Sequence, residues 1–339
     1  MKKYSIIVLI LGLVLFSCKK EVIISTNLSD IGSKGLRMGE KLNVEVNADG
    51  SKIAETELIV NGKSFKGNSV VLDSTNAKLG MNTITFKVKP DGGEMQTFDQ
   101  EIVVLSSVQE KNISYEVVKE YPHNTSLFTE GFFYENGQIW ESAGMENNSK
   151  IVKYTLGSRQ MSQEVPNKPE IFAEGLVKVG NKVYQMTYRN RVLYQYDANF
   201  KLEKEMPMPT ELAEGWGCTT DGTYIYVTDS TADIKVFDAN FKYVRTITVT
   251  GYNETYPQVN ELEYINGVLY ANVFMKNNIL VINPKTGQVL STMDCTDLVT
   301  KNQTNQEAVL NGIAYNPATQ NLLLTGKNWA KIYEVKIKN

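Results

Sequence analysis

The chain has 339 residues, of which 42% are hydrophobic and 22% charged, so it can bury a full core and is neither disordered nor a polytopic membrane protein. Lys and Arg number 35 against 38 Asp and Glu, and this balance gives no electrostatic reason to expect nucleic acid as a partner. The one histidine, His123, excludes metal sites with two or three histidine ligands. Three cysteines without a C-x-x-C pair exclude a zinc ribbon and a disulfide-stapled scaffold.

The first residues have the pattern of a signal peptide. Lys2 and Lys3 precede an apolar run over residues 4–16, which is too short to span a bilayer. The run ends in Leu15-Phe16-Ser17-Cys18, which resembles the lipobox of bacterial lipoproteins. We therefore predict a lipoprotein signal peptide over 1–17 and a lipid on Cys18. The lipid would hold the protein on a membrane of the bacterial cell envelope, on the outer membrane or the periplasmic side.

An envelope location permits a disulfide between the other two cysteines, Cys218 and Cys295. Nothing in the sequence indicates that they meet. We expect two separate buried thiols.

Residues 18–108 form the predicted N-terminal domain, in which short alternating runs are separated by turn residues. The runs cover residues 42–46, 57–60, 83–88 and 101–105, and Asn61-Gly62 and Asp91-Gly92-Gly93 lie between runs. Period-two alternation with such turns predicts antiparallel strands. The size and strand spacing fit a small immunoglobulin-like β-sandwich. It carries no chemical constellation, so we expect a spacer between the lipid and the next domain.

Residues 113–339 repeat a turn followed by an alternating strand five times. The repeats start at Asn136-Gly137, Gly180-Asn181, Asp221-Gly222, Asn266-Gly267 and Thr319-Gln320. The four glycines are 43, 42 and 45 residues apart, and Thr319 takes the fifth place 52 residues later. A period of about 40 to 50 residues with four short strands per unit predicts a β-propeller. The length gives five blades of about 45 residues each, so the predicted fold class is all-β.

Closure of a propeller requires the two ends of the chain to share a blade, because an open sheet edge would otherwise remain. Residues 114–121 and 331–338 are both strand-like, as closure requires. Helix signals are nearly absent, and residues 210–214 and 297–301 could each form a turn.

A second feature recurs before each repeat and places acidic or amide side chains in step. Its members are Glu130, Glu174, Glu214, Glu261 or its neighbour Asn260, and Asn311. Innermost strands line the channel of a propeller, so we expect these side chains near one axis. Carboxylates gathered there raise the pKa of at least one of them and attract a cation or an ammonium group. The alternative is that each Glu-Gly pair is turn chemistry at a strand start.

Aromatic residues accompany this ring: Phe128, Phe172, Tyr188, Trp216, Phe274 and Trp329. Core packing between blades is the alternative for any one of them. Trp216 follows Glu214-Gly215, and the phase of the strand directs it toward the axis. Lys327 lies at the end of a strand in the last repeat, where spacing alone does not distinguish it from a solvated lysine.

Eight motifs in this part of the chain occur in the order found in a known family. They are Tyr121-Pro122-His123-Asn124, Phe128-Thr129-Glu130-Gly131, Trp140-Glu141-Ser142-Ala143-Gly144, Phe172-Ala173-Glu174-Gly175-Leu176, Glu214-Gly215-Trp216-Gly217, Asn260-Glu261-Leu262-Glu263-Tyr264, Leu310-Asn311-Gly312-Ile313 and Leu324-Thr325-Gly326-Lys327-Asn328-Trp329. Residues 113–339 thereby resemble the plant and bacterial type of glutaminyl cyclase, the glutamine cyclotransferases.

The resemblance implies a five-bladed propeller that converts N-terminal glutamine of peptides to pyroglutamate with release of ammonia. It also implies roles for residues. Glu174 is expected to shuttle the proton, and Asn260 and Lys327 to orient the amide or stabilise the oxyanion. Phe128, Phe172 and Trp216 match the aromatic residues of the pocket.

Three residues depart from the family pattern. The family usually has Gln in place of Glu130, and Trp in place of Tyr188 and Phe274. The replacements keep an apolar wall but remove indole N–H donors, so we expect an effect on substrate preference or rate rather than on fold.

Two other functions use the same residues. A non-catalytic, lipid-tethered propeller could bind peptide N-termini without releasing ammonia, and a metal-dependent propeller hydrolase would also use acids and Asn about the axis. For the cyclase we expect N-terminal Gln peptides as substrates, no required cofactor, no catalytic metal and a monomer. A structural calcium ion at residues 229–233 is not predicted, because a solvated turn explains these residues.

Overall fold

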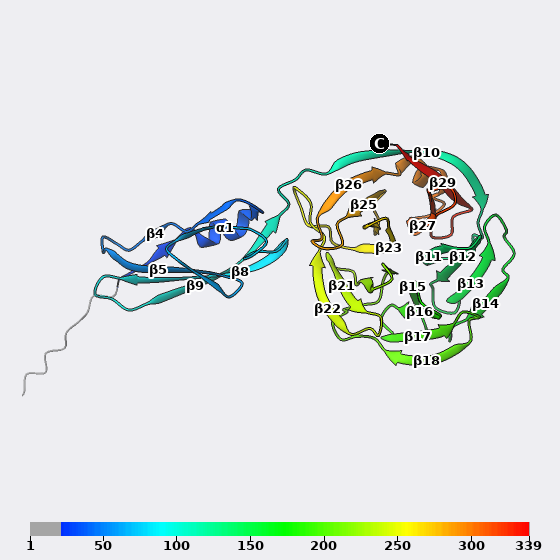
Figure 1. Ribbon diagram of the computed structural model, residues 1–339, viewed down its shortest axis with the longest axis horizontal. Helices are drawn as coiled ribbons and strands as arrows, with labels where there is room; N and C mark the ends of the chain where they lie inside the picture. Colours follow the sequence, from blue (N-terminus) through cyan, green and yellow to red (C-terminus); the bar gives the residue numbers. More distant parts are fainter. Residues whose placement is uncertain (1–21, 339) are drawn as a thin grey trace, which may run out of the picture.

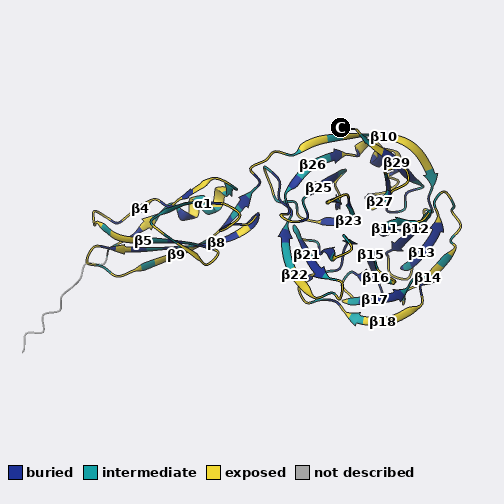
Figure 2. Cartoon of the chain, in the orientation of Figure 1, coloured by how far each residue is buried: buried dark blue, intermediate teal, exposed yellow. Residues whose placement is uncertain are grey.

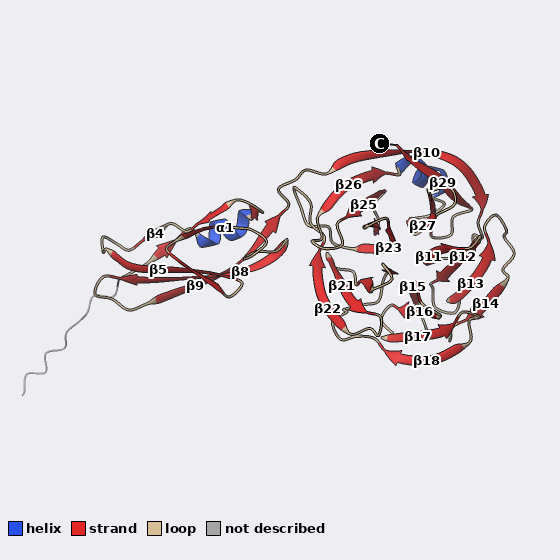
Figure 3. Cartoon of the chain, in the orientation of Figure 1, coloured by secondary structure: helices blue, strands red, loops and turns tan. Residues whose placement is uncertain are grey.

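The computed structural model describes residues 22–338, and almost all of its regular structure is strand (Figure 3). The expected signal peptide and the lipidated Cys18 lie outside the described residues. Within residues 22–338, no helix is both long and apolar enough to cross a membrane. Cys218 and Cys295 are both buried and free, which confirms the expectation of two separate thiols.

The N-terminal part is a layered β-structure with one short helix (Figure 1). A five-stranded sheet has the order β2-β9-β8-β5-β6, and two small sheets pair β3 with β7 and β1 with β4. The elements are β1 (Ser25–Thr26), α1 (Leu28–Lys34), β2 (Leu36–Arg37), β3 (Lys41–Asn43), β4 (Val46–Asn47), β5 (Ile53–Val60), β6 (Lys63–Lys66), β7 (Ser69–Val71), β8 (Gly80–Pro90) and β9 (Gln96–Leu105).

Apolar side chains from both layers form the core of this part. Leu42 on β3 packs in one cluster with Leu58, Ile84 and Phe86 of the large sheet. The alternating burial along β8 is what period-two alternation predicts for a strand with one face in a core. The sequence did not predict α1, whose seven residues include two serines and a glycine, all weak helix formers.

The C-terminal part is a propeller whose five four-stranded units surround one axis (Figure 1). Blade 1 is β11 (Thr129–Glu135), β12 (Gln138–Ala143), β13 (Lys150–Thr155) and β14 (Gln163–Pro166). Blade 2 is β15 (Ala173–Val179), β16 (Lys182–Thr187), β17 (Val192–Asp197) and β18 (Leu202–Pro207). Blade 3 is β19 (Cys218–Thr220), β20 (Tyr224–Thr228), β21 (Asp233–Asp238) and β22 (Tyr243–Thr248).

The remaining two blades contain the end of the chain. Blade 4 is β23 (Val259–Ile265), β24 (Val268–Val273), β25 (Asn278–Ile282) and β26 (Val289–Asp294). Helix α2 (Thr296–Asn302) follows it at the second predicted turn. Blade 5 is β27 (Leu310–Asn316), β28 (Asn321–Gly326), β29 (Lys331–Lys338) and β10 (Lys111–Pro122), so its outermost strand comes from the start of the propeller.

The two ends of the propeller sequence close the ring in blade 5, as predicted. Strand β10 pairs antiparallel with β29 from Ser114 opposite Lys338 to Pro122 opposite Lys331. The first residues of β10 also pair in parallel with β26, which joins blades 4 and 5 into one continuous sheet. Because β10 and β29 pair, neither end of the propeller sequence leaves the ring open.

Burial falls from the axis to the rim of the propeller (Figure 2). Inner strands such as β11 and β27 are buried over most of their length, whereas the outer strands β10 and β18 are mostly exposed. Polar side chains on the inner strands therefore lie in a largely dehydrated environment, where each needs a partner.

Candidate active site

Four of the inner strands bulge at the same point, near their first residue. The pairing register shifts between Thr129 and Gly131 in β11, Ala173 and Leu176 in β15, Val259 and Leu262 in β23, and Leu310 and Ile313 in β27. A bulge leaves residues unpaired and redirects their side chains. The bulges contain four of the predicted polar residues, which are Glu130, Glu174, Asn260 and Asn311.

Glycines beside the bulges allow the inner strands to approach one another around the axis. A Cβ added to Gly131 would lie 2.4 Å from the backbone nitrogen of Leu176, and one on Gly175 would lie 2.4 Å from the Trp216 carbonyl oxygen. These distances leave no space for a side chain. Glu130-Gly131 and Glu174-Gly175 thus belong to strand bulges in the channel and not to turns.

The same packing corrects the predicted ring in blade 3. A Cβ on Gly217 would lie 2.4 Å from the Asn260 carbonyl oxygen, so Gly217, and not Gly215, is the equivalent of Gly131 and Gly175. Trp216 therefore takes the place that Glu130 and Glu174 hold in blades 1 and 2. Glu214 lies two residues before it and instead pairs with Arg189, with 2.7 Å between Arg189 Nε and Glu214 Oε1.

In blade 4, Asn260 holds the equivalent position, and the Glu261 side chain bonds to the backbone of the neighbouring inner strand. Glu261 Oε2 accepts a hydrogen bond from the backbone N–H of Ile313 at 2.7 Å, which ties β23 to β27. Burial raises the pKa of Glu261 well above its usual range, and the nearby Glu263 carboxyl adds to the increase. Glu261 therefore supports the channel wall without contacting Lys327.

Glu130 is the centre of a buried ion pair that crosses from blade 1 to blade 5. Lys327 Nζ lies 2.7 Å from Glu130 Oε1, and the two side chains are 7% and 1% exposed. Asn311 Nδ2 donates to Glu130 Oε2 at 3.2 Å and to the Thr129 carbonyl at 2.9 Å. The charge that distinguishes Glu130 from the usual Gln is therefore balanced by Lys327.

Glu174 and Glu130 are neighbouring buried carboxyl groups, and each affects the pKa of the other. Burial raises the pKa of Glu174 well above its usual range, and the adjacent negative charge of Glu130 raises it further. Burial also raises the pKa of Glu130, but the Lys327 ammonium opposes that increase. The direct ion pair with Lys327 therefore favours the negative charge on Glu130 and the proton of the pair on Glu174.

Two amide oxygens in the bulges of blades 4 and 5 lack hydrogen-bond partners among the described residues. The Oδ1 atoms of Asn260 and Asn311 are buried and unpartnered among the described residues. An unsatisfied buried polar atom is unfavourable by about 1–3 kcal/mol unless a ligand completes it. Asn260 is therefore suited to hold a polar group of a bound molecule. In residues 22–338, no group of three or more His, Cys, Asp or Glu side chains is arranged to hold a metal ion.

Aromatic rings surround these polar groups on the side of Lys327. Lys327 Nζ lies 4.6 Å from the centre of the Phe128 ring and 5.4 Å from that of Phe274. The ring centres of Phe128 and Phe172 are 6.2 Å apart, those of Phe172 and Tyr188 5.7 Å, and those of Trp216 and Phe274 5.8 Å. All five predicted pocket aromatics therefore belong to two adjoining groups.

Trp329 is different from these rings. It is fully buried, and its indole N–H donates to the Ala308 carbonyl oxygen at 3.0 Å. It packs in the core of blade 5 with residues such as Leu298. The prediction that placed it around the ring was wrong, and the alternative of core packing holds for it.

Two groups of residues near the site were not identified from the sequence. Arg189 fixes Glu214 at the rim, and Glu214 Oε2 in turn accepts from the Trp216 indole N–H at 3.1 Å. His123 and Glu141 form a second buried pair behind Glu130. The signal for the second group was present, because both residues lie in motifs of the resemblance, Tyr121-Pro122-His123-Asn124 and Trp140-Glu141-Ser142.

A five-bladed propeller with an acid–lysine pair under aromatic rings defines the class of protein, and residues 94–337 match the glutamine cyclotransferase family. The chain belongs to this family. Over 230 residues it is 33% identical to a glutaminyl-peptide cyclotransferase of Arabidopsis thaliana, covering 66% of this chain and 71% of the plant protein. The crystal structure of Myxococcus xanthus glutaminyl cyclase matches it with a TM-score of 0.63 and 30% identity, over 68% of this chain and 99% of that one.

Proposed function

We propose that the protein is a glutaminyl-peptide cyclotransferase that converts the N-terminal glutamine of peptides or proteins to pyroglutamate and releases ammonia. Membership of the glutamine cyclotransferase family supports this activity, as do the similar enzymes from plant and bacterium. The observation that carries the proposal is the buried Glu174 carboxyl group beside the Glu130–Lys327 ion pair, where burial and the Glu130 charge raise the pKa of Glu174. Such a group can both give and take a proton near neutral pH.

In this reaction the α-amine of glutamine attacks the carbonyl carbon of its own side-chain amide. The amine has an ordinary pKa near 8, so a useful fraction is neutral at pH 7. The new C–N bond forms as the carbonyl π electrons move to oxygen. Glu174 then gives its proton to the departing nitrogen and recovers one from the former amine, so ammonia leaves and the carboxyl group returns to its starting state.

Lys327 and Asn260 are suited to the charge that develops on the amide. An ammonium group has three N–H donors, and Glu130 uses one of them. The other two can stabilise the oxyanion, while the open Asn260 amide orients the substrate amide.

The aromatic residues would shape the substrate. Cyclisation requires the glutamine side chain to fold back onto its own amine, a conformation that an extended peptide rarely adopts. A pocket between the Phe128–Phe172–Tyr188 and Trp216–Phe274 groups would hold the folded form and raise the effective concentration of the amine at the carbonyl.

A coupled ammonia assay tests the proposed function. The purified protein should release one ammonia for each Gln-initiated dipeptide consumed, and none from the same dipeptide with N-terminal Ala. Ammonia release without enzyme-dependent pyroglutamate would contradict the proposal. Saturable binding of the Gln dipeptide without any ammonia release would support the non-catalytic binding protein instead.

We also propose that Cys18 is lipidated and anchors the enzyme in the cell envelope, with the N-terminal β-structure as a spacer. The apolar run of residues 4–16 followed by Leu15-Phe16-Ser17-Cys18 supports this proposal. Mass spectrometry of membrane fractions should find a chain that begins at a diacylated Cys18, and Cys18→Ser should leave the signal peptide uncleaved. Wild-type protein that is cleaved elsewhere and is free of lipid would contradict it.

A further inference from the structure

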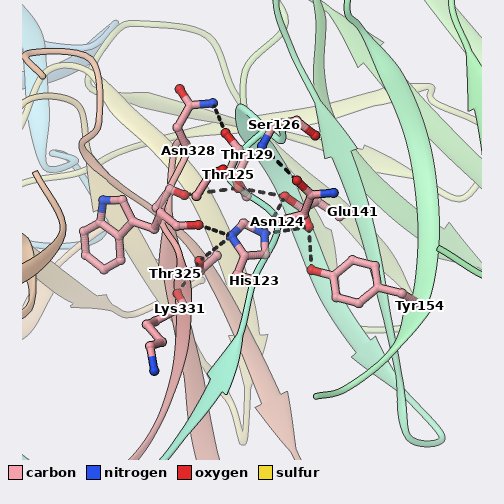
Figure 4. A network of polar contacts seen from close by, with 12 residues as sticks. His123, Asn124, Thr125, Ser126, Thr129, Glu141, Tyr154, Thr325, Asn328 and Lys331 are labelled. Carbon is pink, nitrogen blue, oxygen red and sulfur yellow. Dashed lines mark hydrogen bonds and ion pairs between the residues drawn. The ribbon is translucent and has the colours of Figure 1, made fainter. Parts of the chain in front are cut away.

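The one histidine of the chain lies in a second buried polar cluster, at the seam between blades 1 and 5 (Figure 4). His123 follows β10 and is 1% exposed. Its Nδ1 lies 2.8 Å from the Trp329 carbonyl oxygen, and its Nε2 lies 3.1 Å from Glu141 Oε2 on β12. We name His123, Glu141, Tyr154 and Thr129 the seam cluster.

The contacts of the seam cluster define where its protons are. A carbonyl oxygen can only accept, so Nδ1 of His123 carries a hydrogen. Tyr154 and Thr129 each donate a hydroxyl hydrogen to one oxygen of Glu141, both at 2.7 Å. All of these hydrogen bonds are satisfied when His123 Nε2 also carries a hydrogen and donates it to Glu141, as in an imidazolium–carboxylate pair. Burial alone would lower the pKa of His123, but Glu141 raises it above its usual value.

Such a histidine is unsuited to be the general base of the reaction. Both ring nitrogens are engaged, and no face of the ring is open to solvent or to the aromatic pocket. Glu141 and Tyr154 are the titratable groups that face the ring, from β12 and β13. His123 therefore acts through the residues to which it is hydrogen-bonded.

The seam cluster connects the two strands that carry the ion pair of the active site. On the blade 1 side, Thr129 immediately precedes Glu130. On the blade 5 side, Trp329 lies two residues after Lys327, and Thr325 Oγ1, two residues before it, lies 3.4 Å from His123 Nδ1. The path from Trp329 through His123 and Glu141 to Thr129 therefore crosses the same seam as the Lys327–Glu130 pair, directly behind it.

We propose that His123 and Glu141 are positioning residues for the cyclisation reaction, which hold the turn of Lys327 at a fixed distance from the strand of Glu130. This inference rests on the proposed function. Lys327 and Glu130 are 197 residues apart in the chain. Residues 123–128 join β10 of blade 5 to β11 of blade 1, so His123 lies on the covalent connection that crosses the seam. To this connection the seam cluster adds three hydrogen bonds and one ion pair, none of which involves Glu174, Asn260 or Lys327.

Thr129→Val tests the connection without leaving a buried charge unpaired, because it removes the hydroxyl and keeps the shape. We expect the variant to change the spacing of Lys327 and Glu130. Its kcat should fall about tenfold or more and its KM should change by less than about threefold, because misplaced catalytic groups lower the rate steeply. Thr129→Ser restores the hydroxyl and should restore most of kcat. Tyr333→Phe is the matched control. It removes a buried hydroxyl on β29 of blade 5, which accepts a hydrogen bond from Asn302 of α2, and should leave kcat unchanged.

Wild-type kcat in Thr129→Val, or an equal loss in Thr129→Ser, would overturn the inference. Nuclear magnetic resonance gives a readout that does not depend on activity, because a single histidine gives a single set of ring signals. Both ring nitrogens should stay protonated as the pH rises through about 6.5, where a free histidine loses its proton, and the Lys327 ammonium signal should move in Thr129→Val but not in Tyr333→Phe. A ring that loses its proton near pH 6.5, as a free histidine does, would overturn the inference even if the protein proved inactive.

Discussion

The propeller contains two buried clusters in which a cation faces a carboxylate, and they differ in how completely their hydrogen bonds are made. In the seam cluster, the two ring nitrogens of His123 and both carboxylate oxygens of Glu141 have partners. In the bulges around the Glu130–Lys327 pair, in contrast, the Oδ1 atoms of Asn260 and Asn311 have no partner among the described residues, and the Glu130 charge raises the pKa of the buried Glu174.

This difference separates a structural cluster from a reactive one within a single fold. A satisfied network rigidifies what it joins, because moving any member breaks several bonds at once. An unsatisfied one is unfavourable until a ligand completes it. Substitutions of Glu174, Lys327 and Glu130, and of the aromatic residues Tyr188 and Phe274, test this difference.

The largest expected effect comes from Glu174→Gln, which keeps the shape of the side chain and removes the mobile proton. Ammonia release from a Gln dipeptide should fall about 10²- to 10⁴-fold. Glu263→Gln is the control, because Glu263 is another inner-strand carboxyl with a pKa raised by burial, to about 8, but it binds Thr219. Undiminished turnover in Glu174→Gln, or equal losses in both variants, would remove Glu174 from its role.

Lys327→Met should lower both activity and stability, because it leaves the Glu130 charge buried without a partner. Breaking a buried pair is destabilising by about 3–5 kcal/mol, and loss of an oxyanion donor lowers kcat about 10²- to 10³-fold. Adding Glu130→Gln should recover most of the stability but not the activity. Denaturant unfolding and the ammonia assay on both variants check this, and recovery of activity in the double variant would contradict the role of Lys327.

Glu130→Gln should move the pH dependence of the reaction. The negative charge of Glu130 raises the pKa of Glu174, so removing that charge lowers it, and the freed Lys327 ammonium acts in the same direction. Glu174 would then lose its proton at a lower pH. The alkaline limb of the kcat profile should therefore move to lower pH. A shift toward higher pH would contradict the coupling.

The smallest effect is expected from restoring the usual aromatic residues with Tyr188→Trp and Phe274→Trp. Tyr188 packs against Phe172 and Phe274 against Trp216, and neither is hydrogen-bonded to Glu174 or Glu130 among the described residues. KM for Gln dipeptides should change about two- to fivefold with kcat nearly constant. Steady-state kinetics with several second residues measures this, and a large change in kcat would place these rings in the chemical step.

The sequence predicted the propeller well because its signals are local. Each blade has a turn residue next to an alternating strand, so the period of the glycines determines the number of blades. The closure of the ring by β10 and β29 followed from the need to leave no open edge. The placement of Glu130 and Glu174 at equivalent points of their blades followed from the repeat, whereas the choice of Asn260 over Glu261 came from the family resemblance.

What could not be predicted depends on contacts between distant parts of the chain. Glu214-Gly215 and Trp216-Gly217 both fit the repeated motif, and only the approach of Gly217 to Asn260 distinguishes them. The Glu130 charge is balanced by Lys327, which is 197 residues away in the chain, so the local sequence gave no sign of this ion pair. The seam cluster was missed for the same reason, because His123 and Trp329 meet only when the ring has closed.

The central claim is that Glu174 holds a proton at neutral pH while Glu130, beside it, does not. An infrared difference spectrum between the wild type and Glu174→Gln at pH 7 measures this directly, since a protonated carboxyl group has a carbonyl stretching band that a carboxylate lacks. We expect this band in the wild type and its loss in the variant. A spectrum that instead shows the loss of carboxylate bands at pH 7 would contradict the claim.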